Sequence, residues 1–383
     1  MISKLTSILL FTVCSLTLHA QNIARVENIK IQSKALDQER EILIYTPLDY
    51  DWRMHEYFNV IYVFDAHHRE LFDYTTSILS FISENSKNFI VVGITSPYIK
   101  ETDYSRNNDL LPVLNSEAAQ KRYGKYSGNA DNFYEYVKDE VIPYVEANYR
   151  TLNSVGIGHS LSASFILSSM VKTPTIFDNY IAISPNFAYD NERVAEEILQ
   201  FDYSKFTKPT LVYISHADEG NGYWKEWKPS REKVYSFLQS KDNDNLIFEK
   251  GNFEEYNHWT TFPVSLNKAL PIYIDKTLPL QESILSQEEY EVTINVSVPN
   301  KKDVLYITGN QDKLANWNPK KIKMKKLSDY ERTITLKLKS PTQFKLTKGN
   351  WDTEAEVEGS FGNIIIKPET QSTFNLKVLS FYD

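Results

Sequence analysis

Cysteine is almost absent from this sequence, because its 383 residues include only Cys14, in the N-terminal segment. If that segment is removed, the mature chain has no disulfide, no thiol nucleophile and no cysteine-ligated metal. Positive charge is also in the minority, with 42 Lys and Arg residues against 50 Asp and Glu residues and a formal net charge of -8. Because binding to a phosphate backbone needs a basic patch, we expect no nucleic-acid partner.

The hydrophobic run near the N-terminus, from Ile8 to Val13, is shorter than the roughly 20 residues that a membrane-spanning helix needs. It follows the single charge of Lys4 and precedes the small residue Ala20, a pattern typical of a secretory signal peptide over residues 1–20. A lipid-modified Cys14 is disfavoured, because Val13 is bulky where a lipoprotein signal has a small residue. We therefore expect an exported protein, periplasmic or secreted, with no membrane span.

Hydrophobic residues, by contrast, make up 42% of the chain and include 25 Tyr and 20 Phe. This is enough apolar surface for a folded globular protein, and the length favours two domains. Up to about residue 275, short apolar runs alternate with longer amphipathic stretches. They predict strands at 60–64, 90–92, 155–157, 180–183 and 211–214, and helices at 71–84, 132–149, 161–171, 192–199 and 231–239. The alternation predicts an α/β domain over residues 21–280, with a mostly parallel sheet covered by helices on both faces.

The pattern changes after Leu278, Pro279 and Leu280. Short strand-like runs then follow one another without helices, at 290–298, 304–308, 332–338, 344–347, 363–366 and 374–378. Residues 333–338 alternate cleanly between polar and apolar side chains, and turn residues separate the runs. A small antiparallel β-sandwich is therefore predicted over residues 286–383.

Ser160 lies between a predicted strand and a predicted helix, in the segment Gly-His-Ser-Leu-Ser of residues 158–162. An α/β-hydrolase needs this arrangement, in which a tight turn lifts the serine hydroxyl out of the sheet and small neighbours let the turn close. Gly158 fits the small position before the serine, whereas Ser162 occupies a position where glycine is commoner. The alternative is a serine that only caps the following helix.

A serine hydroxyl is a poor nucleophile until a base, usually histidine, takes its proton. In this fold the histidine follows the nucleophile and the acid, on a loop after the last strand. His258 lies at that position in the chain. His159 adjoins the serine but faces a different direction, and His216 lies too near the acid loop. The acid is expected after the strand at 211–214, where Asp218 and Glu219 are neighbours. Their chemistry does not separate them, and Glu219 is marginally favoured.

An oxyanion needs two preorganised N–H donors. One is expected from Leu161, directly after the nucleophile, and the other from Ala66 or His67, in the loop after the early strand. A metal site at His67 and His68 is the competing interpretation, but adjacent residues rarely converge on one ion and no carboxylate cluster supports it. We therefore expect neither a metal nor a cofactor.

Several segments, in order over roughly residues 25–275, resemble the bacterial putative esterase family that contains esterase D-like, feruloyl esterase and enterochelin esterase-like proteins. They are residues 38–42 and 45–47, 60–66, 106–112, 133–150, 158–162 and 182–186. The resemblance implies a triad of Ser160, Asp218 or Glu219, and His258. The family usually has Asp-Gly where this chain has Asp65 and Ala66.

The C-terminal half resembles a starch-binding type of carbohydrate-binding module in residues 305–310, 314–319 and 343–347, followed by Trp351. The resemblance implies a sugar platform of Trp317 and Trp351, supported by Lys345. Flat aromatic faces suit the apolar faces of a pyranose ring, but the same residues could instead pack a sandwich that only positions the esterase.

Together these features predict a serine carboxylesterase that hydrolyses an acylated carbohydrate or another small esterified molecule through an acyl-enzyme. A polysaccharide is a further expected partner. The alternatives are an esterase for an enterochelin-like siderophore and a non-catalytic carbohydrate-binding protein on a hydrolase fold.

Overall fold

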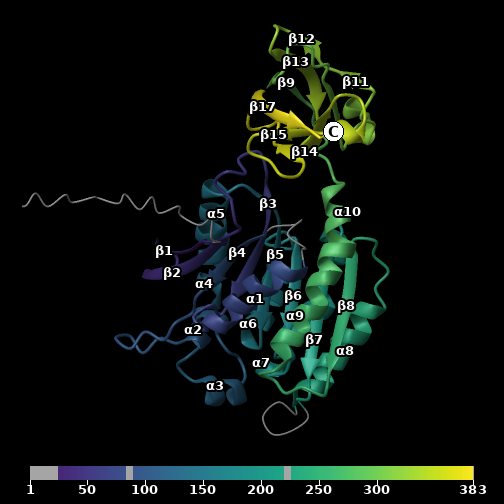
Figure 1. The fold of residues 1–383 in the computed structure, drawn as a ribbon. Helices are drawn as coiled ribbons and strands as arrows, with labels where there is room; N and C mark the ends of the chain where they lie inside the picture. The colour runs from purple at the N-terminus through teal and green to yellow at the C-terminus, as the bar shows by residue number, and fades with distance from the viewer. Residues whose placement is uncertain (1–24, 83–88, 220–225, 383) are drawn as a thin grey trace, which may run out of the picture.

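The computed structural model describes residues 25–82, 89–219 and 226–382, so the predicted signal peptide at 1–20 lies outside the described residues. The chain forms two units, which Figure 1 shows one above the other. We call residues 25–282, which hold the large sheet and its helices, the N-terminal unit, and residues 290–382 the C-terminal unit. No helix in these described ranges combines the length and the apolar character needed to cross a membrane.

The N-terminal unit is built on an eight-stranded sheet with the order β1-β2-β4-β3-β5-β6-β7-β8. The pairs from β4 to β8 are parallel, whereas β1 and β2 pair antiparallel with each other and β2 pairs antiparallel with β4. The strands are β1 (Arg25–Ser33), β2 (Gln38–Thr46), β3 (Phe58–Phe64), β4 (Phe89–Ile94), β5 (Thr151–His159), β6 (Asn179–Ile183), β7 (Thr210–Ala217) and β8 (Leu246–Phe253). The central strands are continuous apolar runs because helices cover both of their faces.

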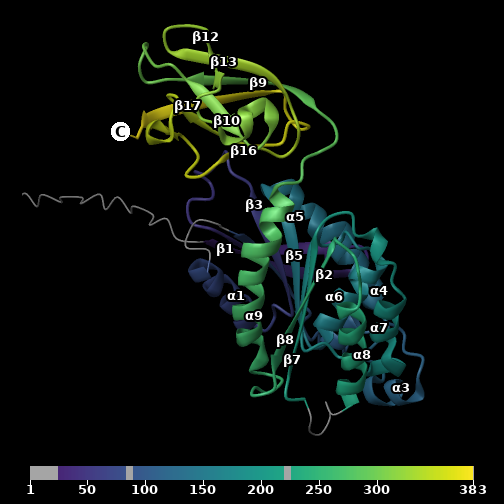
Figure 2. The ribbon, with the colours of Figure 1, turned by 90° about the vertical axis from the view of Figure 1, so that its right-hand side faces the viewer.

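Helices cover the sheet on both sides, as the view in Figure 2 shows. α1 (Arg69–Ile82) and α9 (Thr261–Ile272) pack on one face, and the others pack mainly on the opposite face or around its edge. These others are α2 (Arg106–Leu110), α3 (Glu117–Tyr123), α4 (Ala130–Glu135), α5 (Ile142–Asn148), α6 (Leu161–Lys172), α7 (Tyr189–Gln200) and α8 (Trp227–Gln239). α1 buries Phe72, Thr75 and Leu79, which helical spacing places on one side.

Two long helical stretches are interrupted by wider π-helical turns. The predicted helix at 132–149 consists of α4, the π-helix η1 (Tyr136–Val141) and α5. After α9 the chain continues through the π-helix η4 (Tyr273–Thr277) into α10 (Leu278–Glu282). The fold class predicted from the alternation of strands and helices is confirmed, and the β1–β2 hairpin is an addition to it.

The C-terminal unit is a sandwich of two sheets, with the orders β11-β10-β14-β16 and β12-β13-β9-β17-β15. The described strand pairs are antiparallel except β9 with β17, which is parallel and departs from the predicted pattern. The strands are β9 (Tyr290–Ser297), β10 (Tyr306–Gly309), β11 (Ile322–Lys323), β12 (Lys325–Lys326), β13 (Glu331–Leu338), β14 (Thr342–Thr347), β15 (Ala355–Val357), β16 (Ile364–Ile366) and β17 (Thr373–Phe381). Alternate residues of β9, Val292, Ile294 and Val296, face the core between the sheets.

The two units meet at the amino end of β3. Residues 52–57, which we call the docking loop, precede β3 and form hydrogen bonds to Ile365 of β16 and to the turn just before β16. The C-terminal unit therefore lies beyond the amino ends of the parallel strands, as Figures 1 and 2 agree.

Candidate active site

Ser160 occupies a strained turn between β5 and α6. Its φ of 62° and ψ of -120° lie outside the regions that non-glycine residues favour, as expected of a nucleophile turn. A Cβ on Gly158 would lie 2.5 Å from the carbonyl carbon and oxygen of Ser162, so the turn requires glycine at that position. The Ser162 hydroxyl donates to the His159 carbonyl and accepts from the His159 N–H, both at 2.9 Å. A serine at position 162 thus braces the turn.

His258 and Glu219 form a buried hydrogen-bonded pair at the carboxyl ends of the strands. The His258 Nδ1 lies 3.0 Å from the Glu219 Oε1, and both side chains are almost fully buried. Because a carboxylate accepts, Nδ1 carries the proton and Nε2 is left as the ring nitrogen that can take another. The second Glu219 oxygen, Oε2, pairs with Arg231 of α8 at 3.4 Å. The carboxylate is therefore held at both oxygens.

Of the two predicted acids, the structure brings Glu219 to His258 and leaves Asp218 exposed, with its N–H donated to the Tyr256 carbonyl. The marginal preference for Glu219 thus agrees with the geometry. The sequence contains no spacing that points to Arg231, which belongs to a helix predicted only as a structural element.

His159 contributes a contact that the sequence analysis did not foresee. Its Nε2 lies 2.8 Å from the His258 carbonyl oxygen, and the two imidazole rings are 4.8 Å apart between centroids. Burial, with a smaller contribution from His258, lowers the pKa of His159 to about 3. The neutral ring donates from Nε2 and ties the His258 loop to the residue that precedes Ser160.

The two oxyanion candidates on the early loop are separated by their hydrogen bonds. The Ala66 N–H donates to the Ile94 carbonyl at 3.0 Å, so Ala66 is a wrong prediction as a donor. Within the described residues no acceptor is recorded for the His67 N–H, and Leu161 lies in the first turn of α6, where N–H groups lack intrahelical acceptors. His67 and Leu161 therefore stay the predicted donors.

The His67 ring helps to fix this loop. Its Nδ1 accepts from the Ser96 N–H at 3.2 Å. Burial lowers the pKa of His67 to about 4, so the imidazole is neutral near pH 7. Its ring contacts that of His68, with centroids 4.4 Å apart.

A buried ion pair joins the early loop to the nucleophile turn. Arg106 of α2 binds both oxygens of Asp65, at 2.6 and 2.7 Å, and also donates to the His159 carbonyl at 3.3 Å. Burial raises the pKa of Asp65, but the charge and hydrogen bonds of Arg106 outweigh it, and the net shift is downward. Asp65 itself has a φ of 61°. The sequence analysis used Asp65 and Arg106 only as parts of the family resemblance, because their 41-residue separation carries no motif.

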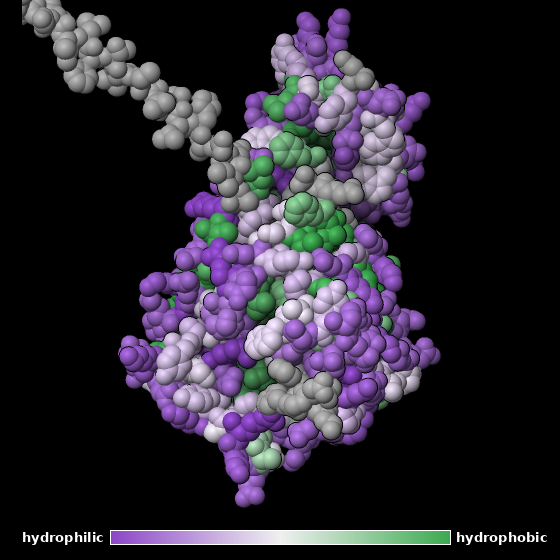
Figure 3. Space-filling model, turned by 60° about the horizontal axis from the view of Figure 1, so that its bottom comes forward, coloured by the Kyte–Doolittle hydropathy of each residue, from purple (hydrophilic) through white to green (hydrophobic). Residues whose placement is uncertain are grey.

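A cavity of about 130 Å³ lies among α3 and the starts of α7 and α8, and no residue of the candidate triad lines it. Trp227 and Asn186 line it, and Trp227 also presents an edge to the His258 ring at 5.3 Å between centroids. The Asn186 carbonyl accepts from Ser164 in the first turns of α6. Trp259, which follows His258, is 73% exposed, and Trp224 lies outside the described residues. Figure 3, which brings this end of the unit forward, shows mainly hydrophilic residues on the visible face.

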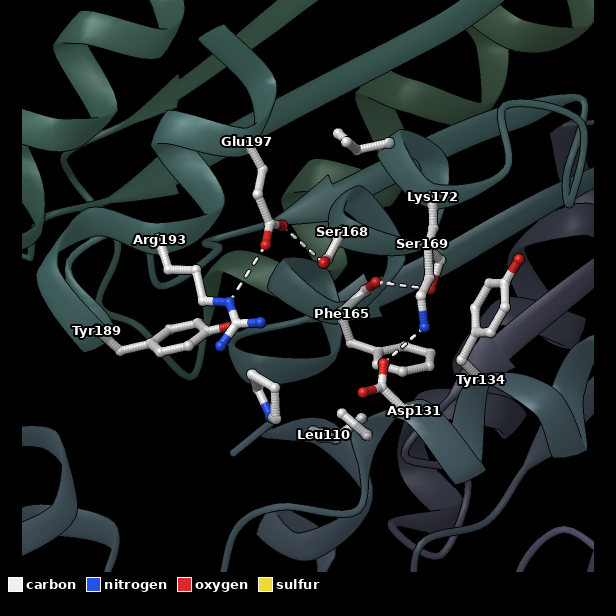
Figure 4. A pocket seen from close by; sticks show the side chains of 13 residues that line it. Leu110, Asp131, Tyr134, Phe165, Ser168, Ser169, Lys172, Tyr189, Arg193 and Glu197 are labelled. Atoms are coloured by element: carbon white, nitrogen blue, oxygen red, sulfur yellow. Dashed lines mark hydrogen bonds and ion pairs between the residues drawn. The ribbon is translucent and has the colours of Figure 1, made fainter. Parts of the chain in front are cut away.

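A second cavity, of about 210 Å³, lies between α2, α4, α6 and α7 (Figure 4). Its charged side chains form ion pairs, Arg193 with Glu197 and Lys172 with Asp131. The Ser168 hydroxyl also donates a hydrogen bond to Glu197. The α6 residues of this cavity begin at Phe165, more than one turn beyond Ser160, and no residue of the candidate triad lines it.

The predicted sugar platform lies on adjacent segments of the C-terminal unit. The Thr347 hydroxyl donates to the Pro319 carbonyl at 2.8 Å, which joins the segments that carry Trp351 and Trp317. Trp351 is 43% exposed and Trp317 is half-buried. Lys345 forms an ion pair with Glu354, just beyond the turn of Trp351, and thus supports this region.

Two family models match the chain: putative esterase over residues 33–317, and starch binding domain over residues 289–375. Ferri-bacillibactin esterase BesA of Bacillus subtilis (strain 168) is 21% identical over 189 residues, which are 47% of this chain and 65% of that protein. The match thus spans less than two thirds of that relative. YjcH, an uncharacterized protein of the same organism, is 28% identical over 255 residues, 64% of this chain and 95% of YjcH.

Among solved structures, an IroE-like serine hydrolase from Shewanella oneidensis shares the fold with a TM-score of 0.55 and 18% identity, over 68% of this chain and 82% of that one. The resemblance to the esterase family is confirmed, because the esterase model covers more than half of the chain. The resemblance of the C-terminal half to a starch-binding module is confirmed by the match of the starch binding domain model. The chain therefore belongs to the putative esterase family of hydrolases and carries a starch binding domain on its C-terminal side.

Proposed function

We propose that the protein is a serine esterase that works through an acyl-enzyme on Ser160. The observation that carries the proposal is the buried hydrogen bond of 3.0 Å between Glu219 and His258, beside the strained turn of Ser160. His258 takes the proton of the Ser160 hydroxyl while its oxygen attacks the ester carbonyl. The same proton then passes to the leaving alcohol, and water, activated in the same way, releases the acid and restores the serine.

The N–H groups of His67 and Leu161 are assigned to the oxyanion of the tetrahedral intermediate. Such preorganised donors stabilise the transition state most when water is excluded and the loops do not move. The bonds from Ser96 to the His67 ring and from Arg106 to Asp65 and His159 support this role, since they hold the early loop and the nucleophile turn together.

The substrate is proposed to be an ester of a small polar molecule. The mainly hydrophilic face of Figure 3 supports this class over a long-chain lipid. An acylated carbohydrate is favoured by the starch binding domain. A siderophore ester is the second candidate, favoured by the name of the relative BesA.

The carbohydrate-binding site of the C-terminal unit is proposed to be Trp317 and Trp351, with Lys345 holding the neighbouring turn through Glu354. The support is the exposure of Trp351 and the bond that joins the two segments. We also propose that residues 1–20 direct export, because of their signal-peptide pattern. N-terminal sequencing of the protein from the native host tests this, and an intact Met1 would contradict it.

The esterase proposal is tested on purified protein with p-nitrophenyl acetate, acetylated xylan and a catecholate triester. Ser160→Ala should lower kcat by about 10³-fold or more. Glu219→Gln should also lower kcat strongly, because a neutral amide cannot stabilise the imidazolium, whereas the neighbouring Asp218→Asn should stay near wild type. Equal residual rates for wild type and Ser160→Ala on every ester would rule out the enzyme.

A further inference from the structure

The contact between the two units is built around a buried carboxylate in the docking loop, Glu56. Its Oε1 accepts from the N–H groups of Phe361 at 2.6 Å and Gly362 at 3.3 Å, and from the Ser360 hydroxyl at 3.3 Å. Its Oε2 forms an ion pair with Arg53, whose side chain is also buried. A carboxylate of the N-terminal unit thus holds a turn of the C-terminal unit.

The same loop is hydrogen-bonded along the edge of β16. The His55 carbonyl accepts from the Ile365 N–H at 2.9 Å, and the His55 N–H donates to the Gly359 carbonyl at 3.0 Å. The Trp52 ring packs on that of Phe361, with centroids 4.5 Å apart. Backbone bonds, a buried charge and an aromatic pair therefore fix the orientation of the C-terminal unit.

This contact and the candidate triad lie at opposite ends of the same sheet. The docking loop leads into Phe58, which pairs with Thr151 at the start of β5, and Ser160 follows the other end of β5. At about 3.3 Å per residue, the length of β5 alone separates the two by about 26 Å. Figures 1 and 2 show the C-terminal unit beyond one end of the sheet and α3 near the other.

Within the C-terminal unit, neither tryptophan belongs to the docked strand β16. β16 faces the docking loop, and β14, β10 and β11 follow it in that order. Trp317 lies between β10 and β11, and Trp351 follows β14. A glucan seated on these residues would therefore be separated from Ser160 by at least the length of β5.

We infer that the C-terminal unit holds the protein on a starch-like glucan while the active site faces away, so that the ester it cleaves is a separate, diffusible molecule. This inference rests on the proposed function of both units. Among the proposed substrates, it favours a small soluble ester, which includes a small acylated carbohydrate. It disfavours an acyl group carried by the same glucan chain that the tryptophans bind.

The test uses the full chain with granular starch, soluble maltoheptaose, p-nitrophenyl acetate and acetylated maltoheptaose. Wild type should sediment with starch, and Trp317→Ala/Trp351→Ala should remain in solution. Tyr330→Ala, which removes an exposed aromatic residue elsewhere on the same unit, is the matched control and should sediment. For both esters, kcat/KM of wild type should be the same with and without saturating maltoheptaose, with a ratio of about 1, and Tyr330→Ala should match wild type.

Three results would overturn the inference, each at a different step. Competitive inhibition by maltoheptaose, or a loss of kcat/KM on acetylated maltoheptaose that matches the loss of starch binding, would show that the bound glucan is the substrate. If wild type did not sediment with starch, the proposed binding of the C-terminal unit to a glucan would be wrong, and the esterase proposal would be unaffected. If kcat/KM did not differ between wild type and Ser160→Ala, the esterase proposal would be wrong, and the proposed starch binding would be unaffected.

Discussion

Asp65 and Arg106 show how residues outside the triad hold its geometry. Asp65 is buried, the Arg106 side chain is 24% exposed, and Arg106 also reaches the carbonyl of His159, next to Ser160. Breaking a buried ion pair leaves an uncompensated charge, which is far more costly than losing an exposed pair. The oxyanion loop and the nucleophile turn therefore depend on the same two side chains.

We predict that Arg106→Met lowers the free energy of unfolding by about 3–5 kcal/mol. It should also lower kcat on p-nitrophenyl acetate, because the early loop is no longer tied to the turn. Urea unfolding and steady-state kinetics measure both effects. Lys377→Met, which breaks the exposed pair with Glu358, is the control and should cost no more than about 1 kcal/mol. A stability of Arg106→Met equal to that of the control would contradict the prediction.

The sequence predicted Ser160 and His258 because each lies directly after or between recognisable elements. It could not separate Asp218 from Glu219, because successive residues at a strand end point in opposite directions and only the three-dimensional arrangement says which faces His258. It also could not exclude Ala66, since the bond of its N–H to Ile94 depends on the pairing of β3 with β4. Arg231 and His159 act through distant contacts that no spacing encodes.

At the scale of elements, the turn from β5 to α6 is the most constrained part of the site. A Cβ on Gly158 would collide with the backbone of Ser162. The β1–β2 hairpin, by contrast, was within reach of the sequence, because β1 shows the alternation of an edge strand, partly buried and exposed in turn. The hairpin was not predicted, because β1 has few apolar residues compared with the central strands.

We predict that Gly158→Ala lowers kcat on p-nitrophenyl acetate by about 10²-fold or more, because small displacements of catalytic groups have effects of this size. Circular dichroism checks that the variant is folded. In the control Gly362→Ala, the new Cβ would meet only Glu56 Oε2 at 3.9 Å, and activity should be retained. Full activity of Gly158→Ala would mean that the turn relaxes without moving Ser160.

The contact between β7 and α8 gives a pH-dependent stability. His216 of β7 bonds to the Tyr235 hydroxyl of α8 at 2.9 Å, and burial, followed by the charge of Arg231, lowers its pKa to about 3. The unfolded chain, with an ordinary histidine pKa of about 6.5, binds a proton between these values that the folded protein does not. The stability that the neutral His216 contributes is therefore complete above about pH 6.5 and lost as the pH falls toward 3.

We predict that His216→Gln reduces the loss of unfolding free energy between pH 6.5 and 4 by up to about 1.4 kcal/mol per pH unit. Urea midpoints measured across this range check the slope. His68→Gln, at an exposed site, should leave the slope as in wild type. An unchanged slope in His216→Gln would show that the histidine is protonated in the folded protein as easily as in the unfolded chain.

At the scale of the whole molecule, the two units depend on each other through Glu56. We predict that Glu56→Gln lowers the free energy of unfolding by about 3–5 kcal/mol, because it removes one charge of a buried ion pair. Differential scanning calorimetry should then resolve separate transitions for the two units, while Glu358→Gln, at an exposed site, should melt as wild type does. A single transition at the wild-type temperature in Glu56→Gln would contradict this role.

The docking loop also affects the solubility of the C-terminal unit. β16 is the last strand of its sheet, and an uncovered strand of this kind has free backbone donors and acceptors that pair with other chains. In the intact protein, the His55 carbonyl accepts from Ile365 of β16, and the His55 N–H donates to Gly359, which precedes the strand. A protease cut that separated the units would therefore release a fragment whose exposed strand edge is prone to intermolecular β-sheet formation. We thus expect the N-terminal unit to protect the starch binding domain from self-association.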